Sequence, residues 1–261
     1  MTKTTIKFPT EDYKNYIEYI QGYCQRKGFS LILKGSLATG TAKKNSDIDL
    51  VVLGSISNED MDNIISGYGK PVMTNFTEKP KGIFILVYKN GICVDLDMRN
   101  TIIEKDLEDC VILNKNENNF LLSDHISRIT DIESKWMPSR PEWYKTLRLL
   151  HRGLIKFLCG KTDAALELLS EIKESLDCID IKLDCVGVKP DCIDIKLNCA
   201  GINIKEADLK EADFIEKADF EADFNDSFKK DMVEIFNCID NKYDVGYEIR
   251  ELFGELFKGL V

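Results

Sequence analysis

The chain has 261 residues, of which 45 are acidic and 35 basic, and its formal net charge is −10. With 44% hydrophobic and 31% charged residues it has the composition of a globular protein of one large or two small domains, which excludes a fibrous or wholly disordered chain. The sequence has neither an apolar run of membrane-spanning length nor a signal-peptide core, so we expect a cytoplasmic protein that makes no membrane contact.

The acidity of the chain is unevenly distributed. Residues 1–110 carry −1 and residues 111–175 carry +1, whereas residues 176–225 carry −7 and residues 226–261 carry −3. The total charge argues against binding nucleic acid through a broad basic surface. Because residues 1–175 are neutral as a whole, they still leave room for a nucleic acid held in a cleft.

The first hundred residues alternate between helical and strand-like patterns. Apolar residues at helical spacing predict helices over 10–27 and 57–70. Short apolar runs predict strands over 30–35 and 47–54, and two β-rich runs around an Asn-Gly turn predict a hairpin over 82–98. This alternation predicts a mixed β-sheet flanked by helices.

From about residue 120 onward the apolar residues keep helical spacing. Helices are predicted over 141–158, 163–176 and a last stretch near the C-terminus. The expected fold class is therefore α+β. We expect a catalytic sheet domain over 1–110, followed by a mainly helical domain over 111–261.

The cysteines and histidines do not form a zinc-binding pattern. Nine cysteines are present, but the sequence has no C-x2-C pair and its only histidines are His125 and His151. A zinc site is therefore not expected. Both histidines fall in stretches predicted to be helical, and we interpret them as ordinary helix residues.

An acidic repeat interrupts the helical part at about 177–225. Residues 177–204 are two tandem copies of a 14-residue unit, with nine identical positions. Four copies of an A-D-L/F phrase follow in residues 205–224 and resemble pentapeptide-repeat β-solenoids, although their register breaks. Helical spacing of the phenylalanines favours a helix, with a solenoid fragment or disorder as alternatives. We regard the acidic repeat as a candidate site for a protein partner.

The stretch from residue 34 to residue 54 carries the clearest chemical signal. A strand ends at Gly35-Ser36, and Asp47 and Asp49 stand at the head of the next strand. Side chains two apart on a strand point the same way, so both carboxylates lie on one face. Paired carboxylates suit Mg²⁺ or Mn²⁺, and Gly35 with Ser36 at a helix start suits a phosphate.

A third carboxylate is expected from a neighbouring strand. The run CVDLDM supplies Asp95 and Asp97, which again lie on one face. Three carboxylates beside a phosphate cradle suit two-metal nucleotidyl transfer, in which one metal activates a hydroxyl and the other holds the leaving pyrophosphate. The sequence leaves open which of the two aspartates is the third ligand.

These motifs resemble the polymerase-β-type nucleotidyltransferase superfamily, where G-S is followed about ten residues later by D-h-D and then by a distant h-D-h. The stretch GSLATGTAKKNSDIDLVVL is most similar to terminal uridylyltransferases and the cytoplasmic poly(A)/poly(U) polymerases. GICVDLDMRN resembles the third-carboxylate strand of that group, which favours Asp95 over Asp97. Gly40-Thr41 also resembles oligoadenylate and cyclic-dinucleotide synthases.

The resemblance implies roles for the residues that match it. Asp47 and Asp49 would ligate both metals, Mg²⁺ or Mn²⁺, and Asp95 would complete the shell of the catalytic metal. Gly35 and Ser36 would hold the β- and γ-phosphates of a nucleoside triphosphate such as ATP. No counterpart is found for the superfamily's nucleotide-recognition segment, so the base preference stays open.

The superfamily also uses a lysine of the helical domain to contact the triphosphate. The helix predicted over 141–158 presents a basic stripe opposite its leucines, formed by Lys145, Arg148, Arg152 and Lys156. Lys145 and Arg148 are therefore candidate nucleotide-binding residues. An ordinary solvated helix face is the competing interpretation.

The leading functional hypothesis is metal-dependent, template-independent transfer of a nucleoside monophosphate from a triphosphate to an RNA 3′ end. The alternatives are an aminoglycoside-type small-molecule nucleotidyltransferase, a synthase of oligo- or cyclic nucleotides, and a toxin-type tRNA nucleotidyltransferase. A non-enzymatic interaction protein is a further alternative, against which the three intact aspartates Asp47, Asp49 and Asp95 argue.

Overall fold

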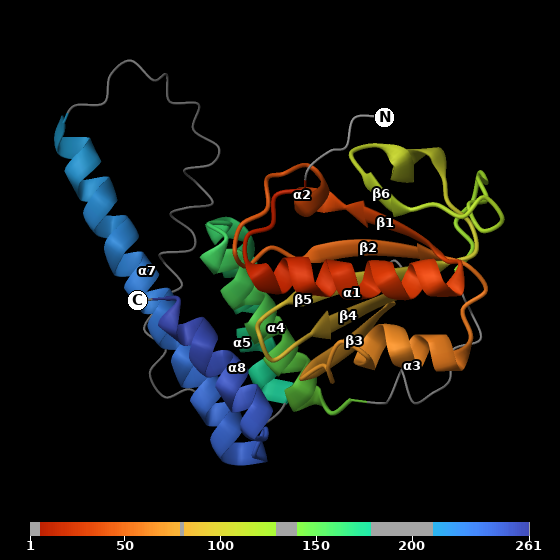
Figure 1. Cartoon of the computed structure of the whole chain (residues 1–261). Helices are drawn as coiled ribbons and strands as arrows, with labels where there is room; N and C mark the ends of the chain where they lie inside the picture. Colours follow the sequence, from red (N-terminus) through yellow and green to blue (C-terminus); the bar gives the residue numbers. More distant parts are fainter. Residues whose placement is uncertain (1–5, 79–80, 129–139, 179–210, 261) are drawn as a thin grey trace.

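The computed structural model describes residues 6–78, 81–128, 140–178 and 211–260. It shows a six-stranded mixed sheet with flanking helices, followed by a helical part (Figure 1). The expected α+β fold class is confirmed.

The sheet and its helices are built from the first part of the chain. The elements are α1 (Glu11–Lys27), β1 (Ser30–Lys34), α2 (Gly35–Ala38), β2 (Ile48–Leu53), α3 (Asn58–Ser66), β3 (Met73–Glu78), β4 (Lys81–Val87), β5 (Cys93–Arg99), a 3-10 turn (Glu104–Leu107) and β6 (Val111–Asn114). The strand order is β3-β4-β5-β2-β1-β6, with β2 and β5 parallel and the other neighbours antiparallel. The helices, strands and hairpin predicted for the first hundred residues are confirmed, and β3 and β6 are additional strands.

Helices α1 and α3 cover one face of the sheet (Figure 1). Every second residue of the central strands is buried beneath them, including Leu50 and Val52 of β2 and Leu96 of β5. Because side chains alternate along a strand, the intervening residues Asp49 and Asp95 project from the opposite face. The hydrophobic pattern thus decides which face carries the carboxylates.

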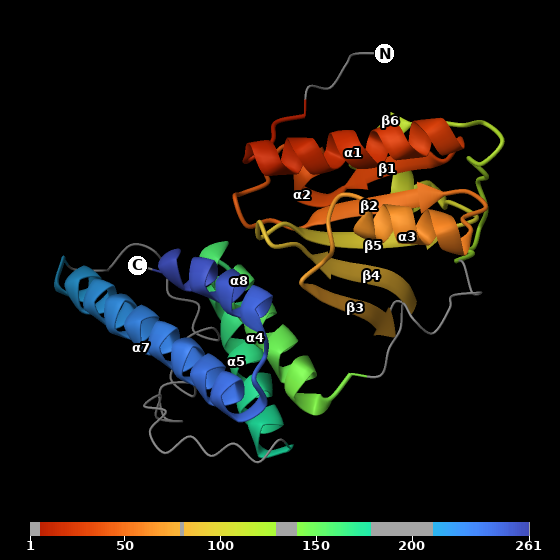
Figure 2. The same cartoon turned by 60° about the horizontal axis from the view of Figure 1, so that its bottom comes forward.

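The helical part packs beside one end of the sheet (Figures 1 and 2). It consists of α4 (Glu142–Leu158), α5 (Thr162–Cys178), α7 (Glu211–Tyr243) and α8 (Tyr247–Lys258). Helix α4 contacts α5, α7 and α8, and its buried leucines belong to the same apolar core as Met73, Val87 and Cys93 of the sheet. The helix that carries the basic stripe is therefore fixed against β3, β4 and β5.

The sheet extends beyond residue 110, because β6 pairs with β1. The helical pattern expected from residue 120 is wrong for 120–128, where isolated bridges join Ile102 to Leu122 and Arg99 to Arg128. The backbone of this segment pairs instead with residues 100–102, since the amide of Ile102 donates to the carbonyl oxygen of Leu121 and the amide of Ser123 donates to the carbonyl oxygen of Ile102, both at 2.9 Å.

Two consequences follow from this irregular segment. His125 lies in a loop rather than in a helix, so its interpretation as a helix residue was wrong. The domain division expected at residue 110 stays a prediction. We propose that the sheet domain runs to about Arg128, because that residue still bridges to β5.

The structure describes only part of the acidic segment at 177–225. Residues 211–224 lie within α7, which confirms the helical interpretation for that portion and not the solenoid. The tandem repeat lies almost wholly outside the described residues, and its role as a partner site stays a prediction. Among the described residues, no helix is both long and apolar enough to cross a membrane.

Candidate active site

Three aspartates lie on the face of the sheet opposite α1 and α3. The parallel register of β2 and β5 places Asp49 directly beside Asp95, and Asp47 lies one residue before β2. Asp97 lies opposite Val51, one step further along the strands. The structure therefore brings Asp95, and not Asp97, next to the pair expected from the sequence.

The turn after β1 is built around a close approach to Asp49. Gly35 has φ +65°, and a Cβ atom added to it would lie 2.1 Å from Oδ2 of Asp49. Only glycine fits this position, because a side chain would collide with the carboxylate and strain the backbone. Ser36, at the start of α2, is thereby placed next to the aspartates.

The loop between α2 and β2 is fixed by hydrogen bonds. The Tyr13 hydroxyl lies 2.7 Å from the carbonyl oxygens of both Lys44 and Ser46. Nζ of Lys43 donates to the carbonyl oxygen of Cys159 at 2.9 Å, which ties the loop to the end of α4. The loop that leads into Asp47 is thus held from both sides of the cleft.

The electrostatics of the three carboxylates are those of crowded like charges. Burial, and then the charges of Asp47 and Asp49, raise the pKa of Asp95 to about 7. Burial, and then the charge of Asp47, raise the pKa of Asp49. Buried carboxylates held this close repel one another unless a cation neutralises them.

The donor set fits a hard divalent cation shared with a substrate. In the described ranges, no three His, Cys, Asp or Glu side chains are grouped tightly enough to form a complete metal site on their own. Mg²⁺ is commonly held by one or two carboxylates together with substrate phosphates and water. Carboxylate oxygens beside Ser36 are suitable for Mg²⁺ or Mn²⁺ bound jointly with a phosphate group.

One pocket lies on the Ser36 side of the aspartates. It has a volume of about 490 Å³, and we call it the Ser36 pocket. Its wall includes Asp47 and Asp49. Hydroxyl and amino groups dominate the rest of its lining, namely Ser36, Thr41, Ser46, Lys43, Lys156 and Lys161.

A second pocket lies on the other side, under α4. It has a volume of about 280 Å³, and we call it the Thr74 pocket. Its lining includes Asp47 and Asp95 together with side chains of β3, β4 and α4. Asp47 and Lys156 line both pockets, whereas Asp49 belongs only to the first and Asp95 only to the second.

The basic stripe of α4 reaches these pockets only in part. Arg148 and Arg152 line the Thr74 pocket and Lys156 lines both, but Lys145 is exposed, pairs with Glu142 and lines neither. At 1.5 Å per residue, Lys145 lies about 16 Å along the helix from Lys156. Helical periodicity selects the face of α4 and cannot tell where along that face the cleft lies.

The sequence reasoning missed two lysines of the Ser36 pocket. Lys43 lies in the loop before Asp47, and Lys161 follows α4. Lys43 lies within the stretch that resembles the superfamily motif, and that resemblance does not mark it as a phosphate-binding charge. Lys161 has no local signal, because only the packing of α4 on the sheet brings it to Ser36.

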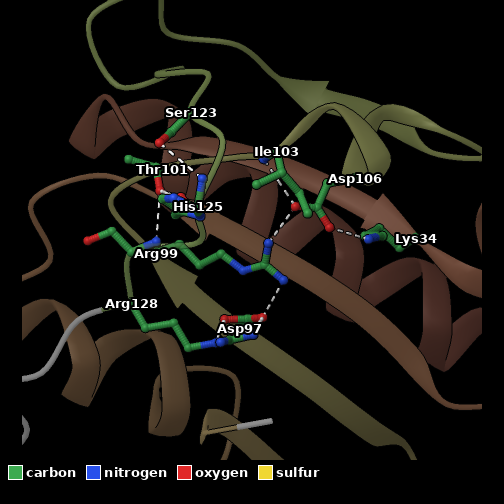
Figure 3. A network of polar contacts seen from close by, with 10 residues as sticks. Lys34, Asp97, Arg99, Thr101, Ile103, Asp106, Ser123, His125 and Arg128 are labelled. Atoms are coloured by element: carbon green, nitrogen blue, oxygen red, sulfur yellow. Dashed lines mark hydrogen bonds and ion pairs between the residues drawn. The ribbon is translucent and has the colours of Figure 1, made fainter.

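Asp97 belongs to a buried ion network further along the same face (Figure 3). Arg99 lies 2.5 Å from Asp97 and 2.5 Å from Asp106, and Arg128 donates to Asp97 at 2.9 and 3.0 Å. Lys34 pairs with Asp106 at 2.5 Å. Asp97 is thus a partner of arginines and is not left free to bind a metal.

Comparisons with known proteins agree with this geometry. Residues 17–134 match the model of the nucleotidyltransferase domain family. None of the curated proteins compared with the chain matches it.

Two solved structures show a weak likeness to the chain. One is the apo form I of a CCA-adding enzyme, with 16% identity and a TM-score of 0.30, covering 56% of this chain and 38% of that one. Another is a CCA-adding enzyme with CTP, with 12% identity and a TM-score of 0.28, covering 96% and 68%. Such low scores say nothing about substrate.

The match confirms the expected resemblance at the level of the domain, while closeness to terminal uridylyltransferases stays a prediction. The matched range contains all six strands of the sheet, together with Gly35, Ser36 and all three aspartates. The comparisons therefore show that residues 17–134 are similar to the nucleotidyltransferase domain family.

Proposed function

We propose that this protein transfers a nucleoside monophosphate from a triphosphate to an RNA 3′ hydroxyl without a template and releases pyrophosphate. The observation that carries the proposal is the division of the aspartates between two pockets. Asp47 lines both, Asp49 lines only the Ser36 pocket and Asp95 lines only the Thr74 pocket. In an in-line displacement, the leaving group and the attacking hydroxyl occupy opposite sides of the reacting phosphorus.

The Ser36 pocket is suited to the triphosphate. Ser36 and Thr41 offer hydroxyl donors, and Lys43, Lys156 and Lys161 offer positive charge. Lysine acts as a point charge toward phosphate, and fixed donors toward the leaving oxygens stabilise the charge that develops there. In this proposal, Gly35 allows the chain to pass close enough to Asp49 for Ser36 to reach the phosphates.

The aspartates would hold the metal, with Asp47 central and Asp49 and Asp95 on either side. When bound, Mg²⁺ or Mn²⁺ lowers the pKa of the acceptor hydroxyl and neutralises charge on the phosphates. The carboxylates of Asp95 and Asp47 orient the acceptor side of the reaction, because both line the Thr74 pocket.

The charges around the Thr74 pocket favour an acceptor that carries phosphate. Arg148, Arg152 and Lys156 line it, against the carboxylates of Asp47 and Asp95. An aminoglycoside carries several positive charges and would meet these cations, whereas the sugar-phosphate backbone of RNA would be attracted to them. This favours an RNA end over the small-molecule alternative.

The proposal is tested by incubating the protein with Mg²⁺ or Mn²⁺, each labelled triphosphate in turn, and either an oligoribonucleotide or an aminoglycoside. We expect a ladder of extended RNA and release of pyrophosphate with at least one triphosphate. A double variant, Asp47→Ala with Asp49→Ala, should abolish both signals. The matched control, Asp12→Ala with Asp124→Ala, removes two exposed carboxylates outside both pockets and should leave them unchanged.

Two outcomes would overturn this proposal. Pyrophosphate release that persists in the Asp47→Ala, Asp49→Ala variant would remove the aspartates from the mechanism. A single-addition product on the aminoglycoside, with unextended RNA in the parallel reaction, would assign the protein to the small-molecule alternative.

A further inference from the structure

The Thr74 pocket is small and lies directly beyond Asp95. Its volume of about 280 Å³ is at the lower end for ligand pockets, which typically measure about 300–1,000 Å³. It can therefore take one ring-bearing unit rather than a folded stretch of RNA. A ligand in this pocket lies next to Asp95, which lines this pocket and not the Ser36 pocket.

Apolar side chains form much of the wall of the pocket. Met73 comes from β3, and Ile155 comes from α4. The other three, Ile83, Ile85 and Val87, come from β4. Ligand pockets typically combine apolar wall with placed polar groups that fix the orientation of the ligand. The apolar part of this wall suits a nucleobase, while the arginines suit a phosphate attached to it.

His151 is the least expected polar group in this lining. Its side chain is 6% exposed, its Nε2 atom is buried, and that atom has no hydrogen-bond partner among the described residues. Buried polar atoms are nearly always paired, so an unpaired ring nitrogen on a residue that lines a pocket is a candidate partner for a bound ligand. The interpretation of His151 as an ordinary helix residue does not account for this.

The ring of His151 is held in one place and stays neutral. It packs edge-on against Phe253, with ring centroids 6.2 Å apart. Burial, and then the charge of Arg148, lower the pKa of His151 to about 4. A neutral imidazole offers one donor and one acceptor, which is the combination that base edges present.

The opposite side of the pocket is also fixed. The hydroxyl of Tyr144 donates to the carbonyl oxygen of Thr74 at 2.9 Å and accepts from its amide at 2.8 Å. Arg140 donates to Oγ1 of Thr74 at 2.8 Å. A ligand in this pocket thus meets a rigid edge strand on one side and His151 on the other.

We infer that the Thr74 pocket receives the 3′-terminal nucleoside of the acceptor and that His151 reads its base. The inference rests on the proposed function, which places the attacking hydroxyl on the Asp95 side. With the base between β4 and α4, the hydroxyl faces Asp95, and Arg148 and Arg152 lie where the preceding phosphate can bind. The enzyme would then select among RNAs by their last nucleoside.

The experiment uses the full chain and four oligoribonucleotides that differ only in their 3′ nucleoside. Their dissociation constants are measured by fluorescence anisotropy without triphosphate, and their kcat/KM values are measured with it. We expect wild type to favour one end over the least favoured by at least about fivefold, the size of one hydrogen bond. His151→Phe keeps the ring against Phe253 and should reduce this preference to less than about twofold.

Two further variants serve as controls for the role of His151. His151→Asn keeps a donor and an acceptor and should retain part of the preference, which also provides a second test if His151→Phe does not fold. His125→Ala removes the other histidine of the chain, whose side chain is exposed and outside the pocket, and should behave as wild type.

The outcomes separate this inference from the proposed function. Equal affinity of wild type for all four ends overturns the inference, and so does an unchanged preference in His151→Phe. A His151→Phe variant that alters the choice of triphosphate but not of acceptor end also overturns it. A clear, His151-dependent preference in binding without extension of any RNA would support the pocket and overturn the proposed function alone.

Discussion

Asp95 and Asp97 project from the same face of β5, two residues apart, into two different environments. Asp95 lies beside Asp49 and has no ion pair with a Lys or Arg within the described parts of the chain. Asp97 is 4% exposed and bound by Arg99 and Arg128. One carboxylate is crowded by like charges, while its neighbour is neutralised by arginines.

This difference divides the face of the sheet opposite α1 and α3 into two regions. We call the region around Asp47, Asp49 and Asp95 the carboxylate end, and the region around Arg99 and its partners the network end. The network end satisfies its own charges and ties the segment after β5 onto the sheet. At the carboxylate end, burial and the charges of Asp47 and Asp49 raise the pKa of Asp95, a state that a bound cation would relieve. This difference distinguishes Asp95, the proposed metal ligand, from Asp97.

The first prediction concerns a substitution that removes one charge from the carboxylate end. Asp95→Asn removes the charge and keeps the shape, so we expect activity to fall by at least about 10³-fold. Thermal unfolding without divalent metal should show no loss of stability, because the substitution relieves repulsion among buried carboxylates. Pyrophosphate release and calorimetry measure the two effects. Activity within tenfold of wild type would contradict the assignment.

The second prediction concerns a substitution that removes one carboxylate from the network end. Asp97→Asn leaves the buried Arg99 with Asp106 as its remaining carboxylate and also deprives Arg128 of its partner, so we expect a loss of about 3–5 kcal/mol in the free energy of unfolding. Measured well below the unfolding transition, kcat/KM should change by less than about fivefold, because Asp97 lines neither pocket. A large fall in kcat/KM with unchanged stability would reverse the two roles.

The third prediction separates the regions by pH. Unfolding lets His151 take up a proton below its ordinary pKa of 6.5, while burial keeps it neutral in the fold down to about 4. Relative to His151→Phe, wild type should therefore lose roughly 3 kcal/mol of stability as the pH drops from 6.5 to 4. The raised pKa of Asp95 acts in the opposite direction, but it acts on both proteins alike. The measurement is urea unfolding of both proteins across that range.

The network end should respond in a lower pH window. Although burial opposes it, the hydrogen bond from Lys34 and the charge of Arg99 lower the pKa of Asp106. A lowered carboxyl pKa contributes stability that is present above its unfolded value, about 3.9, and is lost below it. Wild type and Asp106→Asn should therefore converge only below about pH 4. Convergence near pH 6 would contradict the ion network.

The fourth and smallest prediction compares two lysines of α4. Lys156 lines both pockets, so Lys156→Ala should raise the KM for the triphosphate by about tenfold, the value of one charge-assisted contact. Lys145 pairs with Glu142 on the surface, and Lys145→Ala should stay within about twofold of wild type. Equal effects of the two substitutions would mean that the stripe acts only through its overall charge.

The elements with regular local patterns could be predicted from the sequence. The alternation in β2 and β5, the helical spacing of α4 and the glycine before Ser36 all depend on near neighbours along the chain. Strands β3 and β6 are the two edge strands of the sheet, and β6 pairs with β1, a partner far away in sequence. The helical prediction for His125 is wrong because its segment forms hydrogen bonds with residues 100–102, which local spacing does not encode; Oγ1 of Thr101 donates to the carbonyl oxygen of His125.

The sequence by itself determined that Gly35, Ser36, Asp47 and Asp49 form one site and that a third aspartate of β5 faces it. Periodicity of two along a strand is a local property, and no distant contact can change it. Only the tertiary structure decided that Asp95 lies beside Asp49, that Lys156 and Lys161 reach the cleft, and that His151 lines the pocket. Strand register and the position of one helix on a sheet depend on packing between distant segments, which local spacing does not encode.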